Sequence, residues 1–474
     1  MCAYLIQKAD LPDKVRIIPI HICRPDDIKT RLLGMSKPQT TYIKTHDFAA
    51  KAGQAVLVPD ANGDISCVLF GAGLDNGYAN SALRVGSLAQ KLAPGFYEIT
   101  SAPKDMDINL MAVAWGMGAY KFSKYLSKKP MPSTLVLGEE SDAVESMSIV
   151  KALHFGRDLI NTPASDMGPV ALQGAAQNLA DIYGATLSAV IGDDLLAQNY
   201  PMIHAVGRAA HEVPRLVELE WGDKNAPRLA LVGKGITFDT GGVNMKSAVG
   251  MRMMKKDMGG AAHALALAEM IMAAKLPIRL HVLLAVAENS VSGNAFRPGD
   301  VLSSRKGLTV EIDNTDAEGR LVLGDALTKA SESDPALIID FATLTGAARV
   351  AMGPTIVPFF SNTDAPIAAL LKCGEQQFDP IWNMPLWSPY MSLLRSPIAD
   401  MKNSGSSFGG ALTAALFLQK FVGVKGGQKE QAWMHFDVYG WNPSGSPARP
   451  EGGEIMSVRA VYHWLKNGGL AKLD

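Results

Sequence analysis

Short apolar segments alternate with amphipathic ones over the first 140 or so residues. The segments "VRIIPIHIC" and "AVLVPDANGDISCVLFGAG" have the length and β-branched content of strands, and the second contains a turn signal at residues 61–64. Two further segments, "SALRVGSLAQKLA" and "MAVAWGMGAYKF", have helical spacing, and "STLVLGEE" is typical of a closing strand. The pattern predicts a small α/β domain over residues 1–140.

A polar stretch, "GEESDAVES", leads from this part into a helix expected from about Ala143 to Ile160. Beyond it the expected strands are almost continuously apolar, as in "RLALVG", "RLHVLLAVAEN", "GLTVEID" and "ALIIDFATL", with helices between them. Such strands are typical of a sheet buried on both faces. We predict an α/β protein with a second, larger domain over residues 150–474, built on a mixed, largely parallel central sheet flanked by helices.

The charge balance bounds the classes of partner. The chain has 45 Lys and Arg against 46 Asp and Glu, so its electrostatics give no reason to expect a nucleic-acid or membrane partner. An uncharged apolar run of about 18 residues, which a membrane span would need, is absent from the sequence. The four cysteines have no paired spacing, and charge appears within the first eight residues. We therefore expect a cytoplasmic protein with reduced thiols.

Polar residues follow two of the expected strands, where ligands of such sheets bind. In "LVGKGITFDTGGVNMK" an apolar strand runs into Lys234, Asp239 and Lys246. A glycine-rich turn with solvated charges explains this stretch equally well, and its glycines lack the order of a phosphate-binding loop. Asp257 stands directly before the helix "GGAAHALALAEM", where an aspartate is more often a helix cap than a ligand.

The segment "DNTDAEGRLVLGDAL" places Asp316, Glu318 and Arg320 at alternate positions after an expected strand. If the segment is extended, the three side chains point the same way. A surface ion pair is the simpler interpretation, but the apolar helix that follows at once leaves little room for a free surface loop. Burial of two acids would demand more counter-charge than one arginine supplies.

Four carboxylates thus stand at or near expected strand ends: Asp239, Asp257, Asp316 and Glu318. Carboxylates collected in this way repel one another unless cations lie among them, and divalent metal ions bind such oxygen-rich sets. A set of this size suits two ions that share bridging carboxylates and activate water. The residues alone therefore predict a di-metal hydrolase, without a substrate.

The chain from about Leu153 onward resembles the leucine aminopeptidase family of di-metal exopeptidases. The segment "NTDAEGRL" is similar to the signature of that family, and further matching segments follow in order and spacing: "VGKGITFDTGG", "MKKDMGGAA", "VAENSVSGNAFRPGDV", "FATLTGA", "MPLW" and "ADMKNSGSSFGGALTAALFL". The resemblance implies a catalytic domain that hydrolyses the N-terminal, leucine-like residue of peptides through water bridging two divalent metals. Residues 1–140 resemble the variable accessory domain of the family in their α/β pattern only.

The resemblance also implies the ligands of the two metals. Asp239 and Glu318 would bridge them, and Lys234 and Asp257 would complete one site. Asp316 would complete the other through its side chain and its backbone carbonyl. Because only a neutral amine can coordinate a metal, the pKa of the Lys234 amine would have to be depressed.

Further roles carried over from the family concern the reaction and the substrate. Lys246 would stay charged and polarise the scissile carbonyl, and Arg320 would hold a bicarbonate ion that acts as general base. Three residues would line the pocket for the first side chain and a fourth would hold the second residue through its backbone: Met254, Thr343 and Gly346, and Leu344.

Several points stay open at the level of the sequence. The metals are expected to be Zn or Mn, since oxygen-rich sites accept several divalent ions. Substrates would need a free N-terminus, and the family resemblance implies a homo-hexamer. A di-metal dipeptidase or other amide hydrolase is the alternative, and a DNA-associated regulatory factor a more distant one. "EGGEIMSVRAV" departs from the small-residue segment of many family members, which leaves the preferred first residue open.

Overall fold

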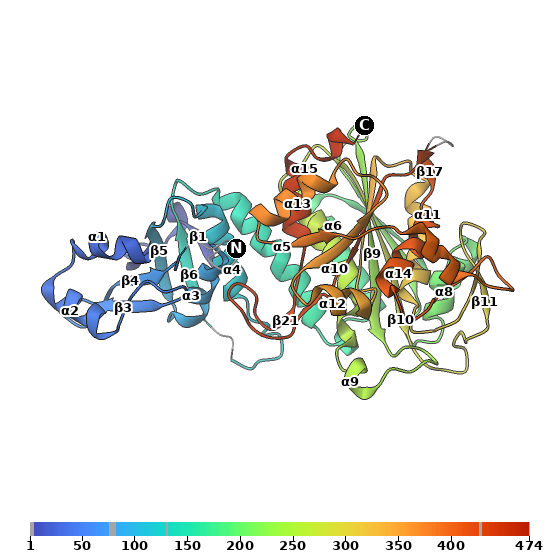
Figure 1. The fold of residues 1–474 in the computed structure, drawn as a ribbon, viewed down its shortest axis with the longest axis horizontal. Coiled ribbons are helices and arrows are strands. Elements are labelled where there is room, and N and C mark those ends of the chain that lie inside the picture. The colour runs from blue at the N-terminus through green and yellow to red at the C-terminus, as the bar shows by residue number, and fades with distance from the viewer. Residues whose placement is uncertain (1–3, 75–81, 129–130, 426–428, 474) are drawn as a thin grey trace. The chain divides into compact units, whose positions relative to one another are not determined.

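The computed structural model describes residues 4–74, 82–128, 131–425 and 429–473. By their internal contacts the residues form two compact units, Met1–His154 with Pro443–Glu451 and Phe155–Asn442 with Gly452–Asp474 (Figure 1). Each unit is α/β, which confirms the predicted fold class. The division falls within the long helix α5, Ala143–Asn161.

The first unit contains a six-stranded sheet in the order β1-β6-β5-β2-β4-β3. Its strands are parallel except for β3, which forms the predicted antiparallel hairpin with β4. Asp60 closes this hairpin, because its Oδ1 accepts from the backbone N–H groups of Asn62 and Asp64. The elements are β1 Leu5–Gln7, β2 Ile17–Cys23, β3 Ala55–Pro59, β4 Ile65–Gly71, β5 Gly95–Ser101, β6 Ser133–Leu137, α1 Ile28–Leu32, α2 Lys37–Thr45, α3 Gly86–Lys91 and α4 Ile108–Ala119, with 3₁₀ turns at Lys8–Asp10, Pro25–Asp27 and Ala82–Val85.

The second unit is built on an eight-stranded sheet in the order β15-β14-β19-β13-β9-β10-β8-β7. The four central strands β19, β13, β9 and β10 are parallel, and antiparallel pairs join them to the strands on either side, so the sheet is mixed as predicted. Its strands are β7 Thr186–Ile191, β8 Arg215–Trp221, β9 Arg228–Asp239, β10 Arg279–Asn289, β13 Leu337–Ala342, β14 Val357–Ser361, β15 Ile381–Asn383 and β19 Trp433–Asp437.

Helices cover both faces of this sheet, and they include α6 Pro169–Tyr183, α7 Asp194–Ala197, α8 Pro201–Gly207, α10 Gly259–Ala273, α11 Gly319–Ser331, α12 Gly346–Met352, α13 Ile367–Gln376, α14 Gly410–Gln419 and α15 Val458–Lys466. The short helix α9, Ala248–Met251, has no buried residue. On β13, Phe341 stacks on His263 of α10, whereas Ile338 and Ala342 belong to a core shared with α11. Neighbouring residues of a strand point to opposite faces, so α10 and α11 lie on opposite sides of the sheet (Figure 1). Burial on both faces explains the continuous apolar strands.

The segment "GLTVEID" does not join the central sheet with the other apolar strands. It forms β12, Thr309–Glu311, which pairs with β11, Val301–Ser303, and β16, Met401–Lys402, in a separate sheet. β10, the preceding long strand, is paired with β9 on one edge and with β8 on the other, so β12 cannot pair with it. The other small elements are the strand pairs Val424–Lys425 with Lys429–Glu430 and Trp441–Asn442 with Gly452–Gly453, and 3₁₀ turns at Ala164–Asp166, Met254–Met258, Ser388–Leu394 and Leu470–Lys472.

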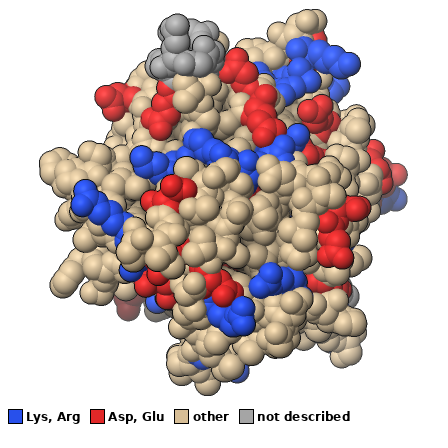
Figure 2. Space-filling view, turned by 90° about the vertical axis from the view of Figure 1, so that its right-hand side faces the viewer, with Lys and Arg blue, Asp and Glu red and all other residues tan. Residues whose placement is uncertain are grey.

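The surface, the cysteines and the helices add three observations. Basic and acidic side chains are interspersed over the face of the molecule shown in Figure 2. Cys23, Cys67 and Cys373 are buried and unbridged, and Cys2 lies outside the described residues. Within the described ranges, no helix has both the length and the hydrophobicity to cross a bilayer.

Candidate metal centre

The central strand β9 contributes two charged side chains to one site. Lys234 lies in the middle of the strand and is 3% exposed, and Asp239 is the last residue of the strand. The Nζ atom of Lys234 is 2.7 Å from Oδ2 of Asp257 and 2.9 Å from Oε1 of Glu318, and it donates to the backbone carbonyl of Thr343 at 3.1 Å. A lysine buried inside a sheet is thus held by two acids from other segments.

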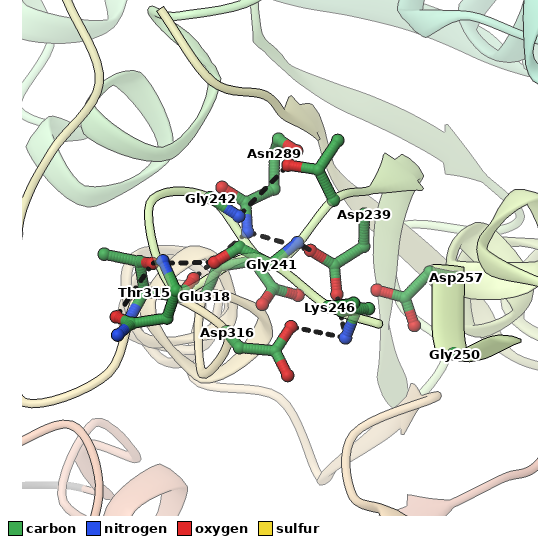
Figure 3. A network of polar contacts seen from close by, with 12 residues as sticks. Asp239, Gly241, Gly242, Lys246, Gly250, Asp257, Asn289, Thr315, Asp316 and Glu318 are labelled. Atoms are coloured by element: carbon green, nitrogen blue, oxygen red, sulfur yellow. Dashed lines mark hydrogen bonds and ion pairs between the residues drawn. The ribbon is translucent and has the colours of Figure 1, made fainter. Parts of the chain in front are cut away.

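Three carboxylates converge at the end of β9. The carboxylate oxygens of Asp239, Asp316 and Glu318 lie within 4.8 Å of one another. Figure 3 shows Lys246 among these side chains, with Asp257 facing them from the other side. The Nζ atom of Lys246 is 2.8 Å from Oδ2 of Asp239 and also contacts Asp316. The four predicted carboxylates and both lysines therefore form one cluster.

Asp257 is part of this cluster and does not cap a helix. It lies in the 3₁₀ turn Met254–Met258 before α10, whose first turn receives no side-chain capping bond. The Asp257 side chain is directed to Lys234 instead, and its Oδ1 lies 2.8 Å from Oγ1 of Thr343. The capping interpretation of this residue is wrong, because the chain turns directly into α10 and directs the carboxylate into the site.

A turn, rather than an extended segment, brings Asp316 and Glu318 together. The segment around them is a turn, and Glu318 already has helical backbone angles, φ −77° and ψ −33°, directly before α11. The turn is stabilised by Asn314, whose Oδ1 accepts from the N–H of Asp316 at 2.8 Å. Asn403, from a distant segment, accepts from the N–H of Asn314 at 3.2 Å. The expectation of an extended segment is therefore wrong.

The cluster is electrostatically incomplete, because two ammonium groups face four carboxylates. Burial and the carboxylates of Asp239 and Asp257 raise the pKa of Glu318 to about 8, although Lys234 opposes the shift. Burial and Asp257 likewise raise the pKa of Asp239 to about 6. For Lys234 burial acts to lower the pKa, but the surrounding carboxylates outweigh it and raise the pKa. Carboxyl groups whose pKa is raised by burial and by neighbouring acids are typical of a site that accepts additional cations.

The donor set fits divalent metal ions. Oε2 of Glu318 is buried and has no donor among the described residues. Oδ1 of Asp316 is also buried, and the Lys246 ammonium group is its neighbour. Buried carboxylate oxygens without donors are the ligands that hard divalent ions bind. Residues from β9, from the turn before α10 and from the turn before α11 could therefore hold metal ions together.

Arg320 lies in the first turn of α11 and is 8% exposed. Its Nη1 donates to the backbone carbonyl of Asn403 at 2.8 Å, and its guanidinium lies 6.0 Å from the centre of the Phe417 ring. Burial lowers the pKa of Arg320 to about 10, which leaves it charged at neutral pH. Its Nε is buried and has no hydrogen-bond partner among the described residues, so the side chain can take an anion.

A cavity of about 800 Å³ opens onto the cluster. Its walls include every candidate residue of the sequence analysis except Glu318: Lys234, Asp239, Lys246, Met254, Asp257, Asp316, Arg320, Thr343, Leu344 and Gly346. Glu318 is 1% exposed and contacts the ammonium group of Lys234. The structure thus brings all the candidates to one place.

Asn289, which has no predicted role, also contacts the cluster. It is the last residue of β10 and stands in register with Asp239 of β9. Its Nδ2 donates to Oδ1 of Asp239 at 2.8 Å and to the carbonyl of Thr315 at 3.0 Å. Thr315 in turn donates through Oγ1 to the carbonyl of Gly241 at 2.6 Å. A polar residue at the end of the neighbouring parallel strand was the signal that could have found Asn289.

Asp437 is a second residue that was missed. It is the last residue of β19, and its Oδ1 accepts from the backbone N–H groups of Leu344 and Thr345, both at 3.1 Å. Its Oδ2 accepts from Oγ1 of Thr345 at 2.6 Å. Asp437 therefore fixes the loop after β13, and the Leu344 amide is already paired with it.

Two family models match the chain. One, described as "Cytosol aminopeptidase family, catalytic domain", matches residues 154–462, and the other, described as "M17 aminopeptidase, N-terminal domain", matches residues 18–138. The matched ranges cover most of both units.

Individual relatives agree with these matches. A protein of Synechococcus elongatus, named probable cytosol aminopeptidase, is 34% identical over 441 residues, which are 89% of this chain and 90% of the relative. A crystal structure of cytosol aminopeptidase from Coxiella burnetii has a TM-score of 0.90 and 40% identity, and covers 98% of this chain and 99% of that one. A structure described as bottromycin maturation enzyme BotP in complex with Mn has a TM-score of 0.85 and 30% identity, with 95% and 99% of the chains covered.

Proposed function

The chain belongs to the cytosol aminopeptidase family of metal-dependent N-terminal exopeptidases, and we propose that the cavity above the carboxylate cluster is its active site. The family uses two metal ions, and the observation that carries the assignment is the convergence of Asp239, Asp316 and Glu318 on one point. Two ammonium groups offset their charge only in part, and Oε2 of Glu318 is buried without a donor in the described structure, so the cluster suits additional cations. The reaction is hydrolysis of the first peptide bond.

We propose that five residues hold the two ions, with Asp239 and Glu318 between them and Lys234, Asp257 and Asp316 completing their shells. Two divalent ions bound here would lower the pKa of a water molecule and polarise the scissile carbonyl. Zn or Mn is expected, and the Mn complex of the bottromycin maturation enzyme, a relative in fold and sequence, supports Mn as one candidate. Asn289 would orient Asp239 for this role, because it donates to the carboxylate oxygen Oδ1.

The two lysines would have different roles. Lys234 can become a ligand only as a neutral amine, and its pKa is raised here by the carboxylates of Asp257 and Glu318. Metal ions on these carboxylates would remove that effect, and burial of Lys234 would then favour the neutral form. Lys246 has 16% of its side chain exposed and reaches the cavity, so it would stay charged and stabilise the developing oxyanion of the substrate.

Arg320 would hold an anion next to the reacting groups. Its buried Nε lacks a hydrogen-bond partner in the described structure, while Nη1 is fixed by the carbonyl of Asn403. This geometry supports an anion beside Arg320, and the family resemblance implies that the anion is bicarbonate, which would supply the general base for the attacking water. Arg320 itself would keep that anion in place without becoming a metal ligand.

The substrate would enter with a free α-amine. Met254, Thr343 and Gly346 line the cavity and would surround the first side chain, and the backbone at Leu344 would hold the second residue. Thr343 also contacts Asp257 through its hydroxyl, so the pocket and the metal centre share this residue. Asp437 would keep the Leu344 backbone in its binding position, because it anchors that loop.

We also propose a cytoplasmic protein that assembles as a homo-hexamer. The location is supported by the names of the relatives, which are cytosol aminopeptidases. The assembly is supported by the family resemblance, and light scattering on the purified protein tests it. A mass of one chain, 50.5 kDa, would contradict it.

Hydrolysis of leucine amide tests the active-site assignment. Glu318→Ala and Asp316→Ala should abolish hydrolysis while the protein stays folded, because each removes a ligand. Asp313→Ala is the matched control: this acid of the same segment is exposed and lies 3.9 Å from Lys402, outside the cavity. It should retain full activity. N-acetyl-leucine amide should resist the enzyme, and full activity of either ligand variant would contradict the assignment.

A further inference from the structure

One wall of the cavity contains a buried lysine that is not among the proposed metal ligands. Lys256 stands directly before Asp257 in the 3₁₀ turn Met254–Met258, lines the cavity and is only 7% exposed. No described carboxylate lies within 4.0 Å of its Nζ, and the atom makes no hydrogen bond with the described residues. Its near neighbour is an aromatic ring, the ring of Tyr439, whose centre is 5.2 Å away. A buried ammonium group without an anion is costly, and an aromatic ring compensates for it only in part.

A second cation shares this ring. Arg349 lies on α12, its guanidinium carbon is 5.1 Å from the centre of the Tyr439 ring, and its Nη1 is 3.5 Å from the tyrosine hydroxyl. Arg349 also lines the cavity, and it is exposed and has no described carboxylate within ion-pair distance. The carboxylate of Asp257, next to Lys256 in the chain, attracts Lys256 but is paired directly with Lys234. Two cations on one ring therefore leave this part of the cavity with a surplus of positive charge.

The neighbouring lysine shows that this arrangement is specific to Lys256. Lys255 precedes it in the same turn, donates to the carbonyl of Asn161 at 2.6 Å and lies over the ring of Trp441. Lys234 and Lys246 are held by the carboxylates of the metal centre. Lys256 and Arg349 are therefore the cations of the cavity wall that can bind an anionic group of a ligand.

The place of the two cations indicates which part of a peptide they meet. Lys256 follows Met254 in one turn, and Met254 lines the proposed pocket for the first side chain. A Cβ atom added to Gly440, the residue after Tyr439, would lie 3.2 Å from the Thr343 methyl group and 3.9 Å from the Lys256 carbonyl. The cations therefore adjoin the first-residue pocket.

We propose that Lys256 and Arg349 form an anion subsite that binds the side-chain carboxylate of an acidic first residue, so that this enzyme accepts peptides beginning with Glu or Asp. The inference rests on the proposed function, because it takes the cavity to be the active site. An entering carboxylate would supply the anion that Lys256 lacks, and its desolvation would be offset by two charge-assisted contacts.

The test compares kcat/KM for three substrates of the metal-loaded enzyme, glutamyl amide, its isostere glutaminyl amide and leucine amide. The wild type should hydrolyse the glutamyl substrate at least as well as the glutaminyl one. Lys256→Met keeps the length of the side chain and removes its charge, so kcat/KM for glutamyl amide should fall about 10- to 100-fold, mainly through KM. Leucine amide should be hydrolysed within about threefold of the wild-type rate, since it has no carboxylate to lose.

Three further variants make the result specific. Arg349→Gln should reduce glutamyl hydrolysis less, about two- to fivefold, because this cation is exposed to solvent. Lys256→Arg should retain the acidic preference, and it guards against a Lys256→Met protein that fails to fold. Arg252→Gln removes an exposed cation outside the cavity and should change neither substrate.

The outcomes separate the inference from the proposed function. If the wild type does not hydrolyse leucine amide, the proposed function is refuted. If Lys256→Met leaves the ratio of kcat/KM for glutamyl amide to kcat/KM for leucine amide unchanged, the subsite alone is refuted. The assignment to the first residue would also be overturned if Lys256→Met slowed hydrolysis of leucyl-glycine, which has a free C-terminal carboxylate, but not of leucyl-glycine amide. Lys256 would then bind the carboxylate of the second residue.

Discussion

Replacing Gly319 with alanine should disturb the metal centre without unfolding the protein. Gly319 is the first residue of α11 and packs directly against the buried side chain of Lys234. A Cβ atom at this position would lie 2.6 Å from Cε and Nζ of Lys234 and 2.8 Å from its Cδ. Carbon atoms in contact are about 3.5–4.0 Å apart, so the lysine side chain must move by about 1 Å.

The magnitude follows from what holds Lys234. Its Nζ is fixed by Asp257, Glu318 and the Thr343 carbonyl, so a shift of the lysine takes a proposed ligand out of place. A displacement of about 1 Å in a catalytic group costs about 100-fold in rate. Overpacking costs about 1–3 kcal/mol of stability, and alanine gains back about 0.5–1 kcal/mol over glycine in a helix. We expect a folded variant that is less stable by about 1–2 kcal/mol.

The assay combines leucine amide hydrolysis, metal analysis and urea denaturation of Gly319→Ala. Gly174→Ala is the matched control, because Gly174 lies within α6 and a Cβ atom there would have no neighbour within 4 Å. That control should retain full activity and gain about 0.5–1 kcal/mol of stability. The reasoning is refuted if Gly319→Ala keeps its metals and its kcat/KM within about threefold of the wild type.

Three more substitutions test separate parts of the structure. Asn289→Ala removes a donor to Asp239 and should weaken metal binding about 10- to 100-fold in a chelator titration; unchanged affinity would exclude the orienting role. Arg320→Ala should retain both metals in elemental analysis but lower kcat about 100-fold, and loss of metal instead would contradict the anion-holding role. Asp325→Ala leaves three backbone N–H groups without their acceptor, so the free energy of unfolding should fall by about 2–4 kcal/mol in urea denaturation. Activity per folded molecule should be unchanged in this last variant, and a protein as stable as the wild type would show that these bonds contribute little.

The fold class and the gathering of the candidates could be predicted because they depend on local pattern. Continuous apolar strands between helices predicted the sheet buried on both faces. The rule that ligands bind beyond strand ends then selected Asp239 at the end of β9. Asp257 followed from the same rule only when the four carboxylates were considered together, since alone it was better explained as a cap.

What the sequence could not supply depends on contacts between distant segments. The alternation of Asp316, Glu318 and Arg320 indicated an extended segment, but Asn403, some 90 residues further along, fixes a turn there. The strand β12 pairs with β16 across a similar separation, so its own hydrophobicity could not place it.

The residues that were missed act through a register or a loop that periodicity does not specify. Asn289 meets Asp239 because β10 and β9 pair in parallel at that register. Asp437 meets the loop at Leu344 because β19 lies beside β13. Each is a polar residue at the end of a central strand, which is the one property that the sequence alone displays.

Anomalous X-ray diffraction from crystals grown with Mn²⁺ tests the central claim most directly, because it places the ions relative to the side chains. We predict two peaks per chain at the cluster, both within about 2.0–2.3 Å of carboxylate oxygens of Asp239 and Glu318. Peaks that lie elsewhere in the chain, or one that leaves Glu318 without a metal contact, would contradict the account.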